Sequence, residues 1–295
     1  MTYTVHVSPD AAAFLALIEP FLLREEAAHN LILGIAGVVR DDPARYSGTP
    51  YFAVVKDAAG EIVGAMMRTL PYNLLLSRAP ENAVPAMAVA VWAAFNTLPG
   101  LVAPTEIAAS FAGEWQVLSG QSHHRAHAER IYALSHVTPP SHVTGEARRG
   151  TEADRDLLIA WNRAFAADAG LQAGPGADAQ GVDARLRATP ETGGLWLWEI
   201  DGKPVSLAGY SGPTAHGIRI SPVYTPPEHR GRGYASANVA ALSQWLLHHG
   251  RQFCFLFTDL ANPTANKIYA QIGYRPVCDV DEYAFLVPLS TPNAQ

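Results

Sequence analysis

The spacing of apolar residues in the C-terminal part of the chain predicts a strand, a helix, a second strand and a second helix. The runs at 217–225 and 253–257 are rich in β-branched and aromatic residues and have the length of strands. The segment 236–247 instead carries apolar residues at helical spacing. The second helix is marked at both ends, because Asn262 suits an N-cap and Gly273 suits the position after the last turn.

The same order of elements is predicted in the N-terminal part, which indicates a duplication with a period of about 145–150 residues. The matched segments are a strand–turn–strand at 51–63 and 195–205, a central strand at 73–77 and 218–224, a helix at 83–96 and 234–248, and a closing strand at 132–137 and 283–287. An opening helix is expected at 9–28 after Ser8 and at 152–167 after Thr151, since both residues suit an N-cap. A chance likeness between two common patterns is the alternative.

A Pro-rich connector at 138–145 separates the two halves. We therefore expect one domain at 1–140, a linker at 141–147 and a second domain at 148–295. Because strands and helices alternate in each half, each domain is expected to form α/β or α+β layers.

The loop between the strand at 217–225 and its helix carries Arg230, Gly231, Arg232 and Gly233. Glycines after a strand and before a helix allow free backbone N–H groups to approach a phosphate, and the arginines add positive charge. The loop is not a nucleotide-binding P-loop, because no Lys-Ser or Lys-Thr follows the glycines. It also departs from the dinucleotide fingerprint, whose third glycine is replaced by Ser236. A surface turn with two solvated arginines is the plain alternative.

Two motifs together resemble the GNAT superfamily of N-acetyltransferases. Arg230, Gly233 and Ala235 match the pattern [Q/R]-x-x-G-x-[G/A] of the acyl-CoA pyrophosphate loop. The helix that starts at Asn262, with Tyr269 and then Gly273, resembles the closing helix of the family. The likeness covers about 217–288 well and about 146–216 loosely. It implies two GNAT-like domains in tandem, each with a mixed, mostly antiparallel central sheet flanked by helices.

The resemblance implies that acetyl-CoA is the acyl donor. The backbone of Val223, Tyr224 and Thr225 is expected to pair with the pantetheine arm beside a splayed sheet. The pyrophosphate is expected on the N–H groups of the loop and of the first helical turn. The residues of that second group are Arg230, Gly231, Arg232, Gly233, Tyr234, Ala235 and Ser236.

The closing helix places Asn262, Asn266 and Tyr269 on one face, at i, i+4 and i+7. The resemblance assigns Tyr269 as the general acid that protonates the CoA thiolate. A core tyrosine with its hydroxyl in water is the alternative. Asn262 or Asn266 is expected to bind the cofactor arm, although Asn262 suits a plain helix cap nearly as well.

The general base is not identified, because the expected central strand has no carboxylate. The remaining candidates are Glu199, His216, Asp259 and Glu282. An acceptor amine that is already neutral would need no base.

The first half lacks the loop chemistry of the second. The segment 82–88 has no glycine and no arginine, and Pro85 removes a backbone N–H donor. No Asn–Asn–Tyr helix is found near 105–125. We expect the first half to be a degenerate domain that does not bind the cofactor through this site.

Composition narrows the class of function. The net charge of −6 and the pI of about 6.0 argue against a nucleic-acid surface that covers the chain. The chain has no apolar run of membrane-spanning length and no signal-peptide pattern at Met1, so a cytoplasmic protein without a membrane segment is expected. Cys254 and Cys278 are expected to be reduced. His123 and His127 lack further ligands, so no metal is expected.

These observations predict transfer of an acetyl or short acyl group from CoA to a primary amine of a small molecule or peptide, by direct attack. A catalytically idle acyl-CoA sensor is the alternative, and an aminoacyl-transferase with a larger acceptor is a third reading. Either a monomer or a homodimer is compatible with the sequence.

Overall fold

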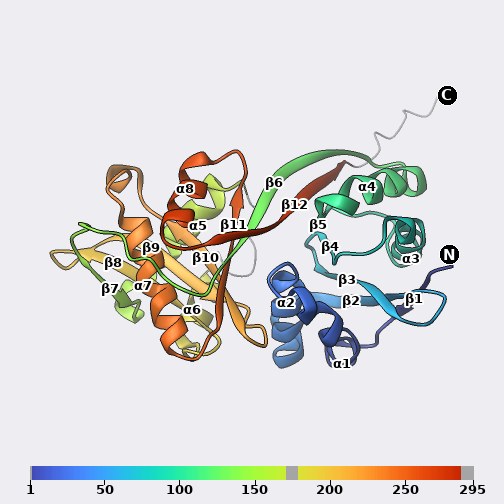
Figure 1. Ribbon diagram of the computed structural model, residues 1–295, viewed down its shortest axis with the longest axis horizontal. Helices are drawn as coiled ribbons and strands as arrows, with labels where there is room; N and C mark the ends of the chain where they lie inside the picture. Colours follow the sequence, from blue (N-terminus) through green and yellow to red (C-terminus); the bar gives the residue numbers. More distant parts are fainter. Residues whose placement is uncertain (1, 171–178, 287–295) are drawn as a thin grey trace. The chain divides into compact units, whose positions relative to one another are not determined.

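A computed structural model describes residues 2–170 and 179–286 (Figure 1). The chain forms two compact units that interleave along the sequence. Unit 1 contains Met1–Glu25, Val39–Arg130 and Cys278–Gln295, and unit 2 contains Glu26–Val38 and Ile131–Val277. The domain division predicted at 141–147 rests on the sequence repeat and stays a prediction.

Unit 1 is a mixed sheet with helices on both faces. Its strands are β1 (Thr4–Val7), β2 (Ser47–Lys56), β3 (Ile62–Leu70), β4 (Leu74–Leu76), β5 (Gly100–Pro104), the first part of β6 (Ser122–Leu134) and the end of β12 (Arg275–Leu286). Its helices are α1 (Ala11–Leu22), α3 (Val84–Ala94) and α4 (Thr105–Ser119). Strands β1 to β4 pair antiparallel in order, β4 pairs parallel with β5, and β5 pairs antiparallel with β12.

Successive side chains of β2 point to opposite faces of the unit 1 sheet, and each face is covered by different helices. Tyr51 and Ala53 belong to the core that α3 and α4 cover, where Trp115 is fully buried. Phe52 points the other way, and its ring centroid lies 5.0 Å from that of Phe14 in α1.

Unit 2 contains β7 (Glu146–Arg149), β8 (Gly193–Ile200), β9 (Lys203–Ser211), β10 (Gly217–Tyr224), β11 (Phe253–Asp259) and the end of β6. Strands β7 to β10 pair antiparallel in order, and β10 pairs parallel with β11. The helices are α5 (Arg155–Asp168), α6 (Ala179–Arg187), α7 (Tyr234–His248), α8 (Pro263–Gln271) and most of α2 (Asn30–Asp41).

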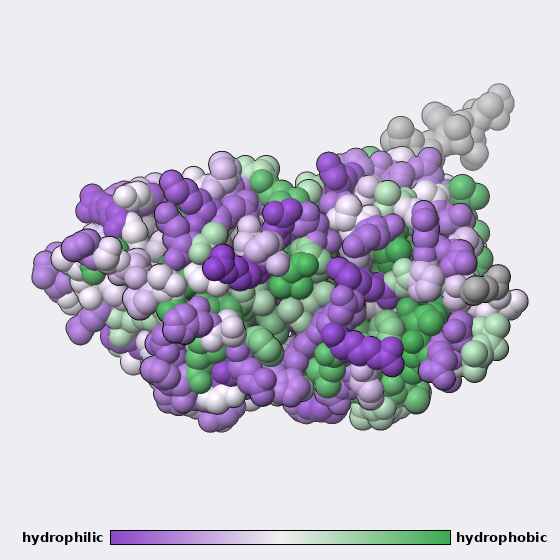
Figure 2. Space-filling model, viewed as in Figure 1, coloured by the Kyte–Doolittle hydropathy of each residue, from purple (hydrophilic) through white to green (hydrophobic). Residues whose placement is uncertain are grey.

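The two faces of the unit 2 sheet have separate cores. Trp196 and Ile220 pack in the cluster that includes α7, whereas Leu195 and Leu197 pack with α5 and α6. Adjacent residues of β8 thus face opposite helices, as the period of two requires. Figure 2 shows mostly hydrophilic side chains on the surface over β7, β8 and β9.

An N-terminal segment completes unit 2. Helix α2 approaches the turn between β9 and β10 so closely that a Cβ on Gly34 would lie 2.7 Å from the carbonyl oxygen of Gly212. Glu26, just before α2, accepts hydrogen bonds from the other end of the same turn. The predicted opening helix at 9–28 was wrong in extent, because α1 ends at Leu22 and a new helix begins at Asn30.

The predicted fold class is confirmed, since a large, mostly antiparallel sheet is flanked by helices. The capping prediction holds at Thr151, which forms a capping box with Asp154. It was wrong at Ser8: Asp10 caps α1, accepting from the backbone N–H of Ala13 at 2.8 Å. None of the described helices is both long and apolar enough to cross a membrane.

Candidate active site

The central feature of unit 2 is the divergence of β10 from β11. The two strands pair at only three positions, from Gly217 opposite Phe253 to Arg219 opposite Phe255. On its other side β10 stays paired with β9 as far as Tyr224, with a register irregularity between Ile220 and Val223. The edge of β10 beyond Arg219 is therefore not paired with β11 in the described structure. An extended ligand can add to such an edge through main-chain hydrogen bonds, and Val223 and Tyr224 lie on this stretch.

The loop after β10 presents main-chain donors. Gly231 and Gly233 have φ values of +77° and +81°, a region that glycine enters without the cost of a Cβ. Helix α7 then begins at Tyr234, and the first helical bond runs from the N–H of Ala237 to the oxygen of Gly233 at 3.0 Å. Within the described residues, the N–H groups of 231–236 have no acceptor. Together with the positive end of α7 they form a site for an anion such as a diphosphate.

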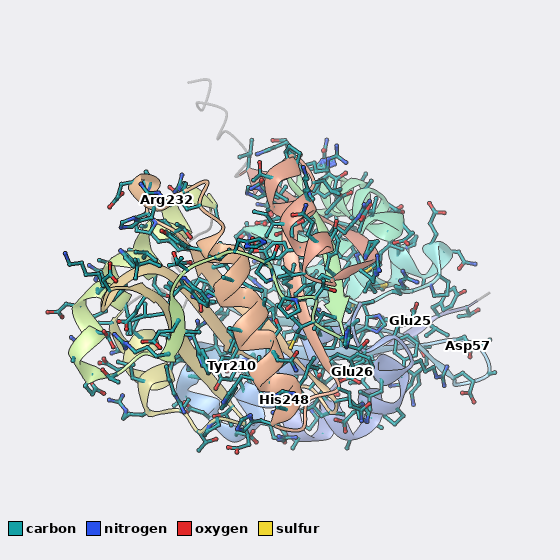
Figure 3. All side chains as sticks on the ribbon, turned by 60° about the vertical axis from the view of Figure 1, so that its left-hand side comes forward. Glu25, Glu26, Asp57, Tyr210, Arg232 and His248 are labelled. Atoms are coloured by element: carbon teal, nitrogen blue, oxygen red, sulfur yellow. The ribbon has the colours of Figure 1, made fainter. Side chains whose placement is uncertain are left out.

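The two arginines of the loop have different roles. Arg230 donates to the carbonyl oxygen of Thr225 at 2.9 Å and to the carboxylate of Asp168 at 2.6 Å. It therefore closes the loop, and its charge is paired. Arg232 is exposed, as Figure 3 shows, and contacts no acidic group among the described residues. Only Arg232 is left with its charge available to a ligand.

The two asparagines of the closing helix are engaged in local structure. The Asn262 side chain accepts from the N–H of Ala265 at 3.0 Å, so the helix-cap reading is seen directly. The Asn266 side-chain nitrogen donates to the oxygens of Asp259 and Asn262, and its oxygen accepts from Thr258 and Tyr132. Because its amide makes four internal bonds, Asn266 has little left to offer a cofactor.

Tyr269 lies on α8 beside the core that contains Ile220 and Leu256. Its ring packs edge-on against Tyr274, with the centroids 5.9 Å apart. Burial raises the pKa of Tyr269 to about 12. The hydroxyl is therefore a proton donor throughout the neutral range, and it has no hydrogen-bond partner among the described residues.

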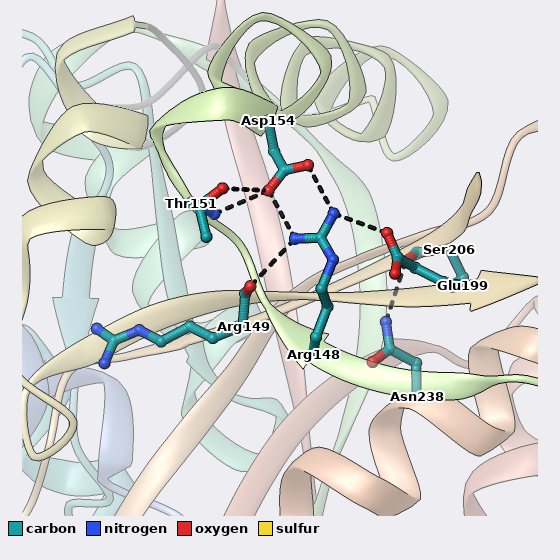
Figure 4. Close-up of polar contacts among 7 residues, drawn as sticks. All are labelled: Arg148, Arg149, Thr151, Asp154, Glu199, Ser206 and Asn238. Carbon is teal, nitrogen blue, oxygen red and sulfur yellow. Dashed lines mark hydrogen bonds and ion pairs between the residues drawn. The ribbon is translucent and has the colours of Figure 1, made fainter. Parts of the chain in front are cut away.

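The candidate bases are all engaged elsewhere. In Figure 4, Glu199 pairs with Arg148 at 2.7 Å, and Arg148 also binds Asp154. Hydrogen bonds from Arg148, then from Thr151, lower the pKa of Asp154 to about 2, although burial alone would raise it.

The other three candidates also have partners. Nδ1 of His216 lies 2.7 Å from a carboxylate oxygen of Glu26, and Asp259 accepts a hydrogen bond from the N–H of Ala261 at 2.7 Å. Glu282 belongs to unit 1, where it accepts a hydrogen bond from Asn73 at 2.8 Å. Each of the four thus has a partner, and Asp259, at the exposed end of β11, is bonded through only one of its carboxylate oxygens. His123 and His127 lie on strand β6 and not on a helix, and no group of three metal-binding side chains occurs among the described residues.

The corresponding helix of unit 1 lacks the donor arrangement. Before α3, the N–H of Ala83 donates to Pro80 at 2.9 Å and that of Val84 donates to Glu81. Pro85 in the first turn has no N–H. The same two turn bonds occur in unit 2, from His229 to Pro226 and from Arg230 to Pro227, but there the residues 231–233 follow before the helix and add free donors. In unit 1 the helix begins at Val84, directly after the turn, so fewer free donors remain, in line with the expectation of a degenerate first half.

Sequence and structure comparisons agree with this geometry. Residues 160–274 match the family described as Acetyltransferase (GNAT) family. No curated protein matches the sequence.

Several solved structures share the fold. A GCN5-related N-acetyltransferase from Kribbella flavida is 18% identical over 88% of this chain and 95% of its own, with a TM-score of 0.59. A second, from Sphaerobacter thermophilus, is 17% identical over 98% of both chains, with a TM-score of 0.60. A tandem GNAT protein from the clavulanic acid biosynthesis pathway is 13% identical over 98% of this chain and 100% of its own, with a TM-score of 0.56.

At these identities the solved structures show the fold alone. The likeness to the GNAT acetyltransferase family is carried by residues 160–274, which lie in unit 2.

Proposed function

We propose that this protein transfers an acetyl or short acyl group from acyl-CoA to a primary amine. The observation that carries the proposal is the pairing of two features in unit 2. The edge of β10 is not paired with β11 beyond Arg219, and the free N–H groups of 231–236 lie in the loop and first helical turn that follow that strand. The first feature suits the pantetheine arm and the second suits the diphosphate of one and the same ligand.

The proposal gives each part of the site a role. Backbone groups of Val223, Tyr224 and Thr225 hold the pantetheine arm, and a free N–H on this edge would polarise the thioester carbonyl. The N–H groups from Gly231 to Ser236 hold the diphosphate, with Arg232 adding charge. Arg230, Asn262 and Asn266 act by shaping the loop and the helix, since their side chains are already bonded to the protein.

In the proposed reaction the amine nitrogen attacks the thioester carbonyl carbon and forms a tetrahedral intermediate. The C–S bond then breaks, and the CoA thiolate takes the proton of the Tyr269 hydroxyl. The proton lost by the amine passes to solvent and the phenolate is reprotonated from it, so no covalent enzyme intermediate is required. The acceptor is a small-molecule or peptide amine that arrives in its neutral form.

The second candidate function is an acyl-CoA sensor without catalysis. One observation favours it: each of the four candidate bases already has a hydrogen-bond or ion-pair partner. Both functions require CoA binding, and only the first releases CoA thiol when an amine is added.

The wild-type protein is expected to bind CoA in calorimetry, and to release free thiol from acetyl-CoA in the presence of a suitable amine from a panel. Ala235→Glu is expected to weaken CoA binding at least about 100-fold, because a carboxylate would stand among the N–H groups. The helix itself should not suffer, since an acidic residue in the first turn favours the helix dipole.

Gln244→Glu is the matched control. It adds the same charge to α7, nine positions or roughly 13 Å further along the helix, and should bind CoA like the wild type. No heat of binding with wild-type protein, or equal binding by Ala235→Glu, would contradict the proposal.

A further inference from the structure

A buried serine holds the point where β10 ends and the loop begins. Ser206, on β9, is 0% exposed. Its hydroxyl donates to the carbonyl oxygen of Tyr224 at 3.2 Å and accepts from the hydroxyl of Thr225 at 2.9 Å. The ladder between β9 and β10 ends with Tyr224 opposite Leu207. These two bonds therefore fix the chain one residue beyond the last strand pair.

The main chain of the same serine also bonds to the helix that follows the loop. Asn238, in α7, is fully buried, and its side-chain nitrogen donates to the main-chain oxygens of Ser206 at 3.2 Å and Trp196 at 3.3 Å. Figure 4 shows the amide of Asn238 on α7 directed at the strands. Because Asn238 lies four residues after Tyr234, where α7 begins, it ties the first turn of the helix to β8 and β9.

The loop itself has few anchors between these two tethers. Apolar packing is limited to its two ends, where Pro226 is buried and Tyr234 packs beside Trp198, whereas Glu228, Arg230, Gly231 and Arg232 between them are exposed. Arg230 bonds to Thr225, at the first tether, and to the exposed carboxylate of Asp168 on α5. The two buried contacts on Ser206 hold the end of β10 and the start of α7, and so both ends of the loop, to one point of β9.

Burying the side chains of Ser206 and Asn238 costs free energy. This cost indicates that the two residues have a role in fixing the position of the loop. An amide in an apolar core loses hydration, and only well-placed bonds offset that loss. The side-chain oxygen of Asn238 has no hydrogen-bond partner among the described residues, so the amide is only half satisfied by this arrangement. A leucine has the same branching and number of side-chain heavy atoms and would avoid this cost, although its two methyl groups need more room.

We propose that Ser206 and Asn238 are positioning residues of the donor site: they hold both ends of the loop 225–233 to one point of β9, so that the diphosphate and the pantetheine arm of one CoA molecule are bound at a fixed spacing. This inference rests on the proposed function. Neither side chain touches the ligand, and both act through the main chain of the loop and the first turn of α7.

The test compares Ser206→Ala and Asn238→Leu with the wild type, using CoA and pantetheine as probes. Each variant is expected to bind CoA about five- to tenfold more weakly in calorimetry, the loss that follows when a binding site is no longer preorganised. Pantetheine lacks the diphosphate, so its affinity for Asn238→Leu, measured by competition with acetyl-CoA, should change by less than about twofold. Ser206→Ala should weaken pantetheine as well, because Ser206 bonds Tyr224 and Thr225.

Ser243→Ala is the matched control, because Ser243 is a fully buried serine on the same helix that bonds Tyr274 at 2.9 Å. It is expected to lower the melting temperature and leave CoA affinity unchanged. Equal CoA affinity of wild type, Ser206→Ala and Asn238→Leu would overturn the positioning role alone. An equal loss in Ser243→Ala would reduce it to general packing. Absence of CoA binding by the wild type would instead overturn the proposed function.

Discussion

Replacing Tyr269 with Phe is expected to lower the rate of acetyl transfer by about 100- to 1000-fold, the contribution of a positioned general acid. The ring stays in place, since Phe retains the packing of Tyr269 against the core and against Tyr274. CoA affinity should therefore stay within about twofold of the wild type, because the loss lies in the transition state alone. Thiol release under saturating acetyl-CoA and amine measures the effect.

The pH dependence of the wild type gives a second readout for the same residue. Because burial raises the pKa of Tyr269 to about 12, the hydroxyl stays protonated well above neutral pH. The rate should therefore show no fall from ionisation of Tyr269 up to about pH 10, and any rise with pH reports the deprotonation of the acceptor amine. In Tyr269→Phe the shape of the profile should be preserved at a lower level.

Tyr274→Phe is the control for this experiment. It removes a buried hydroxyl that bonds Ser243, next to Tyr269, and should cost about 1 kcal/mol of stability with little effect on rate. A Tyr269→Phe enzyme with full turnover would remove the acid from the mechanism. A Tyr274→Phe enzyme that is equally slow would show that the aromatic packing matters and not the Tyr269 proton.

Much of the fold could be predicted from short-range signals in the sequence. The cap at Asn262 and the stop at Gly273, where φ is +110°, were predictable because a few neighbouring atoms decide them. The positive φ values of Gly231 and Gly233 followed for the same reason. The opening helix was predicted too long, because the apolar pattern does not reveal that the chain leaves unit 1 at Glu26.

The candidate site was less predictable than the fold, since a residue type does not reveal its partners. Asn266 has the spacing of a ligand-binding residue, yet its amide is satisfied by the backbone and side chains around it. Ser206 and Asn238 gave no sequence signal, because their importance comes from contacts between segments that are 18 and 32 residues apart. Strands with alternating residues and apolar helices often include a polar residue such as Ser206 or Asn238. Only the tertiary contacts of these two residues show that they hold the loop.

Glu26 is a buried carboxylate whose removal should cost stability. It comes from the N-terminal part of the chain, yet it bonds only to the turn before β10 in unit 2. One carboxylate oxygen accepts from the main-chain N–H of His216 at 2.8 Å and of Gly217 at 3.2 Å, and from the hydroxyl of Thr214 at 2.5 Å. The other oxygen lies 2.7 Å from Nδ1 of His216.

Glu26→Ala is expected to lower the free energy of unfolding by about 3 kcal/mol, because it removes the charged acceptor of the His216 N–H and the Thr214 hydroxyl and leaves the Gly217 N–H with Thr214 alone. Glu25→Ala is the matched control. Its carboxylate is nearly half exposed and pairs with Arg78, so its loss should cost less than about 1 kcal/mol. Figure 3 labels both residues. Denaturant unfolding at neutral pH gives the two values, and equal values would contradict the role of Glu26.

The contribution of Glu26 to the free energy of unfolding should also depend on pH. Burial tends to raise its pKa, but the hydrogen bonds from Thr214 and His216 and the charge of His216 outweigh burial, so the pKa lies below the ordinary value of 4.5. A carboxylate with a lowered pKa stabilises the fold fully above its unfolded pKa, and this stability is lost as pH falls through the folded pKa. The stability difference between wild type and Glu26→Gln should therefore be constant from pH 7 to about 5 and shrink below about 4.5. A difference that is the same at pH 7 and well below 4 would show that Glu26 does not act through its charged form, and that its packing alone holds α2 to unit 2.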